Sequence, residues 1–200
     1  MRQQAHTAVR ISERGAATRT GLLAAAREVF TSVGFAQAGV TDIVTRAGAS
    51  VGSLYHHFSG KADLYLVLFD DFQLELAERT RRAVHKARGS GVTDPKELFL
   101  AGATAYLDAC IEERDLARLF VSGDGPPGFD LVMRRRTHDW AMRNVEFFAR
   151  SAEPVDEALA VVLTGAMVMA VAEVSLGEDA GRMRRLADGV LKVMSRIENP

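Results

Sequence analysis

The apolar positions of this chain recur every three or four residues, which is the spacing of one face of an α-helix. Between residues 61 and 87, for example, Leu64, Leu68, Phe72 and Leu76 follow one another at intervals of four. No segment shows a convincing strand pattern, so we expect an all-α fold. The predicted helices cover residues 18–33, 41–47, 51–58, 61–87, about 95–113, a short stretch ending at Phe120, 129–151, 155–176 and 179–197.

Glycine and proline mark the ends of these helices. Gly48 can adopt the left-handed conformation that ends one helix, and the Ser50 hydroxyl can cap the next. Asp94 and Pro95 combine an N-cap with a proline at the first helical position. Further breaks are predicted at 89–91, 123–128, 153–154 and Gly177.

The two short helices at 41–47 and 51–58 meet at a tight turn, which is the arrangement of a helix-turn-helix. Leu54 and Phe58 of the second helix would point back into a core. The remaining side chains would face outward, and their small, polar and aromatic character suits a groove floor and its flanking phosphates. The pattern therefore indicates a DNA-binding transcription regulator that uses Val51, Ser53, Tyr55, His56 and His57.

Charge is distributed unevenly between the two parts of the chain. The whole chain has 200 residues, 48% of them hydrophobic, and a net charge of −1, which excludes a globally basic, sequence-blind DNA coat. Residues 1–61 nevertheless hold seven Lys and Arg against three acids, and the remainder holds 18 against 23. Arg2, Arg10 and Arg14 precede the first predicted helix. They are either a solvated tail or an arm that reaches phosphate or a minor groove.

Cys110 is the only cysteine, so neither an intrachain disulfide nor a cysteine-based zinc cluster can form. A cytoplasmic location fits this usage. We find no export segment, and we judge that no apolar run approaches the roughly 20 residues needed to span a bilayer. The longest weakly polar stretch, Leu159 to Val171, is predicted to be a buried interface helix and not a membrane segment.

Several spaced motifs occur together in the first third of the chain. Thr18-Arg19 precedes an apolar pattern from Leu22 to Phe35, the helix-turn-helix follows, and Phe58-Ser-Gly-Lys61-Ala-Asp-Leu64 completes the series. In this order the motifs resemble the TetR (tetracycline repressor-like) family. The resemblance implies an amino-terminal arm and three-helix DNA-binding domain at 1–61, joined by a long helix to a helical ligand-binding and dimerisation domain within 62–200.

The resemblance also assigns roles to individual DNA-facing residues. Val51 and Ser53 are implied to contact base edges, and Gly52 to allow close approach. Two positions depart from the family pattern, because Gly39 stands where a capping Thr is frequent and Ala49 where Val is common. Thr41 then becomes the candidate for the cap-to-phosphate contact. The complete predicted DNA-binding set is Thr41, Arg46, Ser50, Val51, Gly52, Ser53, Tyr55, His56, His57 and Lys61.

Two of these residues also allow a structural interpretation. Arg46 could equally be a solvated surface arginine, and His57 beside Phe58 could be half-buried core. Lys61 lies at a helix N-terminus, where its charge is unfavourable for the helix dipole but suitable for holding a phosphate together with the free amides.

The last two helices suggest a homodimer. Apolar stripes run along both helices, and pairing across a two-fold axis would bury them and place two recognition helices in successive major grooves of a palindromic operator. A monomer core is the alternative. The stripes comprise Leu159, Leu163, Ala166 and Ala170, followed by Leu186, Val190, Val193, Met194 and Ile197.

In the family, an apolar pocket in the carboxyl-terminal domain takes a small molecule that usually releases DNA. Aromatic and methionine side chains could line it here, although such side chains fill ordinary cores as readily. Polar residues among apolar neighbours could answer a ligand or simply reach solvent or an arginine. The predicted lining is Phe99, Tyr106, Asp108, Cys110, Phe120, Met133, Trp140, Phe147, Thr164, Met167, Met169 and Glu173.

Other functions were weighed against this one. Gly48-Ala-Ser50-Val-Gly52 matches the G-x-S-x-G elbow of hydrolases, but that elbow needs a preceding strand where the pattern predicts a helix. His56 and His57 point about 100° apart on a helix and lack further metal ligands nearby. We expect no enzyme activity, cofactor or metal. An activator or a ligand-independent regulator stays open beside the repressor.

Overall fold

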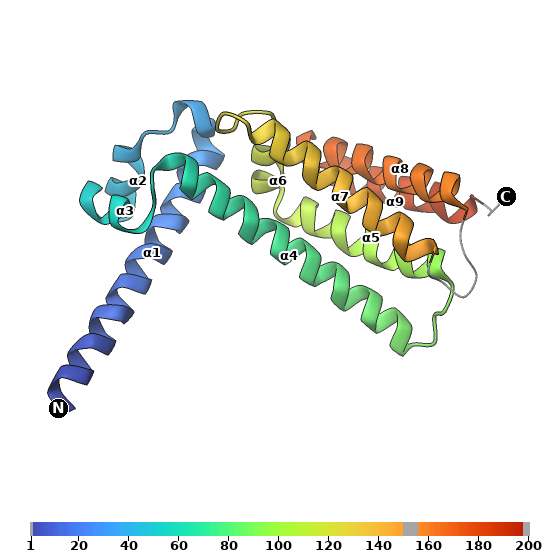
Figure 1. Cartoon of the computed structure of the whole chain (residues 1–200). Helices are drawn as coiled ribbons and strands as arrows, with labels where there is room; N and C mark the ends of the chain where they lie inside the picture. The colour runs from blue at the N-terminus through green and yellow to red at the C-terminus, as the bar shows by residue number, and fades with distance from the viewer. Residues whose placement is uncertain (1, 150–155, 198–200) are drawn as a thin grey trace. The chain divides into compact units, whose positions relative to one another are not determined.

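The structure is a computed structural model that describes the backbone of residues 2–149 and 156–197 and the side chains of 15–149 and 156–197. Within these residues every regular element is a helix, nine in all (Figure 1), as the apolar spacing predicted. The helices are α1 (Arg2–Gln37), α2 (Val40–Arg46), α3 (Val51–His57), α4 (Lys61–Gly89), α5 (Pro95–Glu112), α6 (Arg114–Val121), α7 (Phe129–Ala149), α8 (Glu157–Leu176) and α9 (Ala180–Arg196).

The chain forms two compact units. The first contains Met1–Asp71 together with the short segment Asp124–Pro126, and the second contains Phe72–Gly123 and Pro127–Pro200. The boundary therefore lies inside α4 and not at its first residue, where the sequence placed the end of the DNA-binding domain. Helix α4 therefore contributes residues to both units.

The first unit is held together by an apolar face of α1 that packs against α2 and α3. Leu22 and Ala26 on α1, Ile43 on α2 and Leu54 on α3 are completely buried. These positions follow the helical spacing of the sequence, which explains why three helices of such different length form one core. Three aromatic rings add to this core with centroids 5.2 to 5.8 Å apart, namely Phe30, Phe35 and Tyr65.

Helix α1 begins earlier than predicted. The apolar pattern indicated a start near residue 18, whereas the helix runs from Arg2. The predicted arm ahead of the first helix is therefore helical, and this part of the prediction is wrong. The side chains of Arg2, Arg10 and Arg14 lie outside the described side chains, and the break predicted at Glu153 and Pro154 lies outside the described residues.

Near its end, α1 is interrupted at Gly34, whose φ of 80° and ψ of 171° are accessible to glycine alone. The carboxylate of Asp124 fills the space beside this glycine and would collide with a Cβ there. It accepts a hydrogen bond from the Ala36 amide at 3.1 Å, and the Tyr65 hydroxyl donates to the Asp124 carbonyl at 3.2 Å. Burial, followed by the nearby Asp124 charge, raises the pKa of Tyr65. The loop between α6 and α7 is thereby bound to the first unit.

The second unit is a bundle in which α8 packs against α5, α6, α7 and α9 (Figure 1). Helix α5 begins as predicted, with the Asp94 carboxylate accepting from the Lys96 amide and Pro95 in the first turn. The Lys96 ammonium donates to the carbonyls of Ser195 and Ile197 at 3.1 and 2.9 Å. It thus caps the last turn of α9, where the carbonyl groups lack helical partners.

Helix α8 is more apolar than the sequence analysis allowed. It has 20 residues, and its most apolar window has a mean hydropathy of 2.1, enough by length and composition to cross a membrane. The prediction that no apolar segment approaches the length needed to span a bilayer is therefore wrong. However, 44% of this window is buried by the surrounding helices, as in the core helix of a bundle.

The stripe proposed for α8 is also wrong in its register. Leu159, Leu163 and Ala170 are at most 4% exposed within a single protomer, because they form the core against the neighbouring helices. Met194 of α9 is likewise buried. The apolar side chains that α8 and α9 leave exposed are Val161, Val162, Val168, Met169, Leu176 and Val193.

Candidate nucleic-acid interface and ligand cavity

The turn between α2 and α3 is built by local hydrogen bonds. Gly48 has a φ of 61°, and the Ala49 amide donates back to the Val44 carbonyl at 2.9 Å. Ser50 then caps α3 by accepting from the Ser53 amide at 3.0 Å. Both the left-handed glycine and the serine cap are confirmed, and they set the angle at which α3 leaves the turn.

Helix α3 has a buried side and an exposed side. Leu54 within the helix and Phe58 just after it are buried, as predicted, and the Arg19 guanidinium lies 5.2 Å from the Phe58 ring centroid. Val51 is 45% exposed and Tyr55 58% exposed, and Gly52 and His56 are exposed beside them. Most of the side chains predicted to read DNA therefore share one solvent-facing surface.

Ser50 and Ser53 are hydrogen-bonded to each other through their hydroxyls at 2.9 Å. The Ser50 oxygen therefore serves the start of α3, and the segment before it is helix α2 and not a strand. These contacts explain the Gly48 to Gly52 motif as turn chemistry, without the strand that a hydrolase elbow requires.

Helix α2 lacks a side-chain cap because its N-cap residue is Gly39. The Asp42 carboxylate accepts from the Gly39 amide at 3.1 Å, so only half of a capping box is present. Thr41 in the first turn of α2 is exposed, which leaves its hydroxyl accessible for the predicted phosphate contact. At the end of the helix, Arg46 is exposed and forms a 2.9 Å ion pair with Glu28 of α1.

His57 is half-buried, whereas its neighbour His56 is exposed, and their ring centroids lie 4.9 Å apart. A Cβ added at Gly15 would lie 3.9 Å from the His57 ring, so His57 faces α1. Within the described side chains, no group of three His, Cys, Asp or Glu residues could hold a metal ion. Of the two histidines, only His56 lies fully on the exposed surface of α3.

Lys61 is half-buried, and its ammonium contacts protein groups. Its ammonium donates to the carbonyls of Phe35, Ala36 and Ala38 at 2.8, 3.3 and 3.0 Å, and lies 4.5 Å from the Phe35 ring centroid. These carbonyls belong to the end of α1 and the residues after it. The structure thus gives Lys61 a different role from the predicted phosphate contact, because it ties the first turn of α4 to the end of α1.

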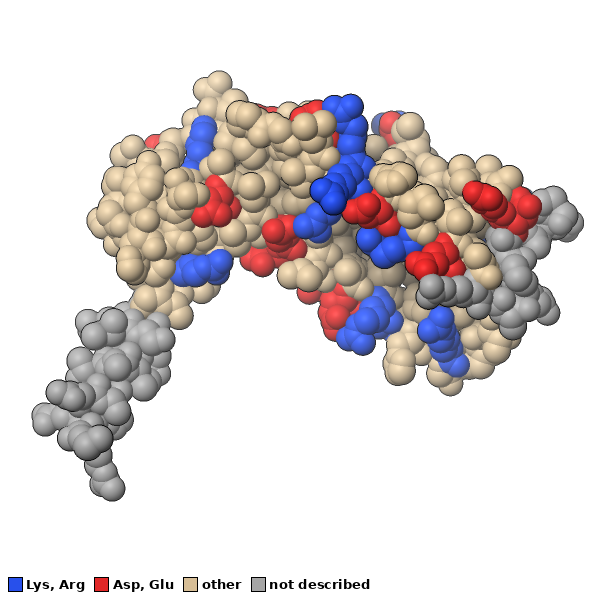
Figure 2. All heavy atoms as spheres, viewed as in Figure 1, with Lys and Arg blue, Asp and Glu red and all other residues tan. Residues whose placement is uncertain are grey.

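Charged side chains of both signs are intermixed over the middle of the face shown in Figure 2. The first unit presents mainly uncharged side chains on that face, and two of its cations, Arg46 and Lys61, have protein partners. The surplus of positive charge counted in the sequence therefore translates only partly into free cations among the described side chains.

The second unit contains a cavity of about 400 Å³. Helix α4 supplies one wall, and helices α5, α7 and α8 supply the others. At Gly102 of α5 a Cβ would lie 3.1 Å from a Thr80 methyl carbon and 3.2 Å from a Val84 methyl carbon, so the absence of a side chain lets the helices approach. The cavity is lined by Thr80, Arg81, Val84, His85, Arg88, Leu98, Phe99, Gly102, Ala103, Tyr106, Trp140, Asn144, Phe147 and Met167.

Five residues that the sequence proposed as ligand contacts do line this cavity: Phe99, Tyr106, Trp140, Phe147 and Met167. They come from three different helices, and the fold brings their side chains together. The Tyr106 and Trp140 rings lie 6.3 Å apart by centroid. Burial raises the pKa of the Tyr106 hydroxyl, with a smaller contribution from the neighbouring Cys110, so the hydroxyl stays protonated.

The other proposed contacts lie elsewhere. Asp108 pairs with Arg184 at 2.6 Å, and Thr164 is buried with its hydroxyl 3.5 Å from the Asn144 amide nitrogen. Phe120 packs between Phe72 and Phe129 in the core. The remaining four are also outside the cavity lining. Cys110 is buried, which raises its pKa to about 12, Met133 lies on α7, and Met169 and Glu173 are exposed.

Sequence reasoning missed the whole wall that α4 contributes. The sequence treated α4 as a connecting helix with one apolar face, and its polar residues carried no signal of a cavity. Arg81, His85 and Arg88 recur at spacings of four and three residues, which places them on one side of a helix. That spacing was visible in the sequence and could have pointed to them.

Comparison with known proteins agrees with this geometry. Residues 22–68 match the profile described as bacterial regulatory proteins, tetR family, which covers α2, α3 and the adjoining parts of α1 and α4. Residues 22–68 therefore form a DNA-binding domain of the TetR family. The HTH-type transcriptional activator FasR of Mycolicibacterium smegmatis is 34% identical over 106 residues, which are 53% of this chain and 46% of FasR. The chain thus spans less than half the length of that relative.

Solved structures of TetR-type regulators share the fold over nearly the whole chain. A transcriptional regulator (TerR/AcrR family) from Aquifex aeolicus has a TM-score of 0.67 at 18% identity, covering 88% of this chain and 99% of that one. The fatty acid degradation regulator FadR from Bacillus halodurans has a TM-score of 0.61 at 16% identity, covering 87% and 94%. At these identities the likeness concerns the fold alone.

The partners of Lys61 lead to a prediction about this TetR-family domain. Replacing Lys61 by Met should lower the free energy of unfolding by about 1 to 3 kcal/mol, because three carbonyls lose a charged donor. Urea denaturation followed by circular dichroism measures the loss, and Lys86→Met on the exposed surface of α4 is the control.

If Lys61 instead contacts a DNA phosphate, the Lys61→Met variant should give a different result in two measurements. Unfolding would be unchanged, and the salt dependence of DNA binding would fall by about one counterion.

Proposed function

We propose that this chain binds a palindromic operator as a homodimer in the cytoplasm and represses transcription until a small, largely apolar molecule enters the cavity of each protomer. The observation that supports this proposal most strongly is that one helix belongs to both the DNA-binding unit and the cavity wall. Helix α4 begins at Lys61 beside the end of α1, and its residues from Thr80 to Arg88 line the cavity.

The exposed surface of α3 supports the DNA contact. Val51, Gly52, Tyr55 and His56 are accessible on one side, and a helix of this size fits the major groove. Val51 and Ser53 are the candidates for base edges, with the Ser53 hydroxyl held in place by Ser50. The candidates for phosphate and nearby contacts are Thr41, Arg46, Tyr55 and His56.

The exposed apolar side chains of α8 and α9 support the homodimer. Val161, Val168, Met169 and Leu176 recur at helical spacing on one face of α8, with exposures between 39% and 62%. Gly165 lies within the same stripe, and a Cβ there would meet nothing within 4 Å, which favours close approach of a second helix. A contiguous apolar face of this kind is typical of an interface.

To release DNA, the effector must bind the DNA-free conformation much more tightly than the DNA-competent one. To change a population that is about 99:1 competent for DNA into 1:99, the effector must favour the released state by about 10⁴-fold. A cavity of about 400 Å³ that is partly open to solvent and has aromatic walls can bury enough of an apolar molecule to supply this preference.

Activation of transcription is the second candidate. FasR, which is 34% identical to this chain over 106 residues, is named a transcriptional activator. The DNA contact and the dimer would be the same in both cases. Promoter output with and without the bound protein separates an activator from a repressor.

Selection from a random duplex pool tests the DNA-binding proposal. The parent protein should enrich a palindromic sequence whose half-sites suit two recognition helices about 34 to 36 Å apart. Ser53→Asn should change the preferred bases at symmetric positions, because amide and hydroxyl groups read base edges differently. Tyr55→Phe should keep the sequence preference.

Leu74→Ala, at an exposed apolar residue of α4 outside the first unit, is the matched control and should select the parental sequence. Recovery of the same motif with the same affinity by Ser53→Asn would show that residue 53 does not read the bases.

The homodimer is tested by Met169→Glu, which places a charge in the middle of the exposed α8 stripe. We expect sedimentation equilibrium to give twice the protomer mass for the parent and the protomer mass for the variant, since burying an unpaired charge is costly. Met142→Glu is the control, because Met142 of α7 is 52% exposed against 62% for Met169, and this variant should remain dimeric. A parent protein that sediments as a monomer rules out this interface.

A further inference from the structure

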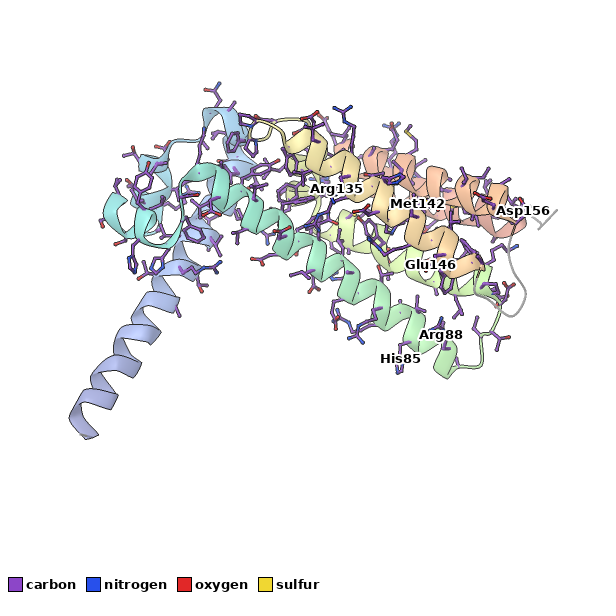
Figure 3. All side chains as sticks on the ribbon, viewed as in Figure 1. His85, Arg88, Arg135, Met142, Glu146 and Asp156 are labelled. Atoms are coloured by element: carbon purple, nitrogen blue, oxygen red, sulfur yellow. The ribbon has the colours of Figure 1, made fainter. Side chains whose placement is uncertain are left out.

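The cavity in the second unit has an uneven distribution of charge. Its walls are formed by apolar and aromatic side chains, whereas three cationic or titratable residues of α4 line one side, namely Arg81, His85 and Arg88. None of the described residues that line the cavity is acidic. His85 and Arg88 lie toward the carboxyl end of α4 (Figure 3).

The three residues differ in their existing partners. Arg81 donates to the Glu78 carboxylate at 2.7 and 3.2 Å, and this contact lowers the pKa of Glu78. For His85 and Arg88 the described side chains provide neither an ion pair nor a hydrogen bond of this kind. Arg88 therefore brings to the cavity a guanidinium whose charge no carboxylate of the described residues neutralises.

The polar groups deeper in the cavity are neutral donors. Burial keeps the Tyr106 hydroxyl protonated, and the indole of Trp140 can donate one hydrogen bond. The Asn144 amide reaches the Thr164 hydroxyl only at 3.5 Å, at the limit of a hydrogen bond. Between these groups, Leu98, Phe99, Phe147 and Met167 present apolar surface.

We infer that the molecule taken up by this cavity is an apolar compound with a single anionic head group, such as a medium-chain carboxylic acid. This inference rests on the proposed effector function and specifies its ligand class. The apolar tail lies among Phe99, Phe147 and Met167. The anionic head faces Arg88 and His85, where the planar guanidinium can donate two parallel hydrogen bonds to a carboxylate.

A neutral apolar molecule fits the cavity less well. Arg88 is exposed, so a neutral apolar molecule would leave its guanidinium in water without a ligand contact, whereas an acid supplies a charged acceptor for it. We therefore expect the protein to bind an apolar acid more tightly than its neutral analogue, and this difference in affinity identifies the ligand class.

Trp140 is the only tryptophan of the chain and lines the cavity, so its emission reports binding directly. We propose to titrate the full-length protein with decanoate and with 1-decanol, which share the same alkyl chain. Decanoate should shift the emission and bind at least about tenfold more tightly than decanol, since a hydrogen-bonded charge contributes this much or more.

Arg88→Met removes the charge and keeps an apolar stem, and it should weaken decanoate binding about tenfold while leaving decanol binding within twofold. His85→Gln should weaken decanoate binding by a smaller factor. Lys86→Met is the matched control, because Lys86 is an exposed cation of the same helical turn that does not line the cavity. This variant should bind both compounds like the parent.

Two results overturn the inference. One is equal affinity of the parent for acid and alcohol, including the absence of binding by either at millimolar concentration. The other is an Arg88→Met variant that retains parental affinity for decanoate.

The same samples separate this inference from the proposed function. If operator binding, measured by anisotropy of a labelled duplex, is intact but decanoate does not bind, the ligand class is wrong and the DNA-binding proposal stands. If decanoate binds with the expected dependence on Arg88 but leaves operator affinity unchanged, the ligand class stands and effector-controlled release is wrong.

Discussion

The continuity of helix α4 is the constraint on which the proposed function depends. Its first turn is tied to the end of α1 by the three hydrogen bonds of the Lys61 ammonium, and its last turns form one wall of the cavity. A helix keeps its hydrogen-bonded geometry along its length and bends only gently without a proline or a bulge. A displacement of α4 at the cavity is therefore carried along the helix and not absorbed locally. Under the proposed function, ligand and DNA would be coupled by a rigid-body mechanism of this kind.

Two further contacts bear on how the helices around the cavity can move when a ligand binds. Gly102 allows α5 to approach α4 at Thr80 and Val84, so a ligand that enters beside this contact must be accommodated by the helices around it. In the first unit, Asp124 fills the space at Gly34 and bonds to the Ala36 amide, which connects the α6–α7 loop to the end of α1. The end of α1 thus receives contacts from Lys61 and from Asp124. Both contacts are hydrogen bonds between residues distant in the sequence, and the loss of each can be measured separately.

The sequence predicted most of the fold but only part of the sites. Helical spacing and caps such as Ser50 and Asp94 are local signals, and they located most helices and the turn before α3 correctly. The cavity is a tertiary feature, so its aromatic residues could be named as candidates, but Phe120 could not be told from Phe99 without the packing. Lys61 illustrates the same limit, because a lysine near a DNA-binding motif and a lysine that caps another helix look alike in sequence. The register of α8 failed because its apolar residues surround the helix, leaving no single stripe to read.

Operator affinity of a Gly102→Leu variant tests the coupling through α4 most directly. A leucine at this position must push Thr80 and Val84 away, and it thereby imitates an occupied cavity without any ligand. Fluorescence anisotropy with the duplex selected by the parent should show a change of about fivefold or more, the lower range of measured coupling between sites. Thr104→Leu, at an exposed residue of α5, should bind like the parent. A folded Gly102→Leu protein with parental operator affinity would contradict the account.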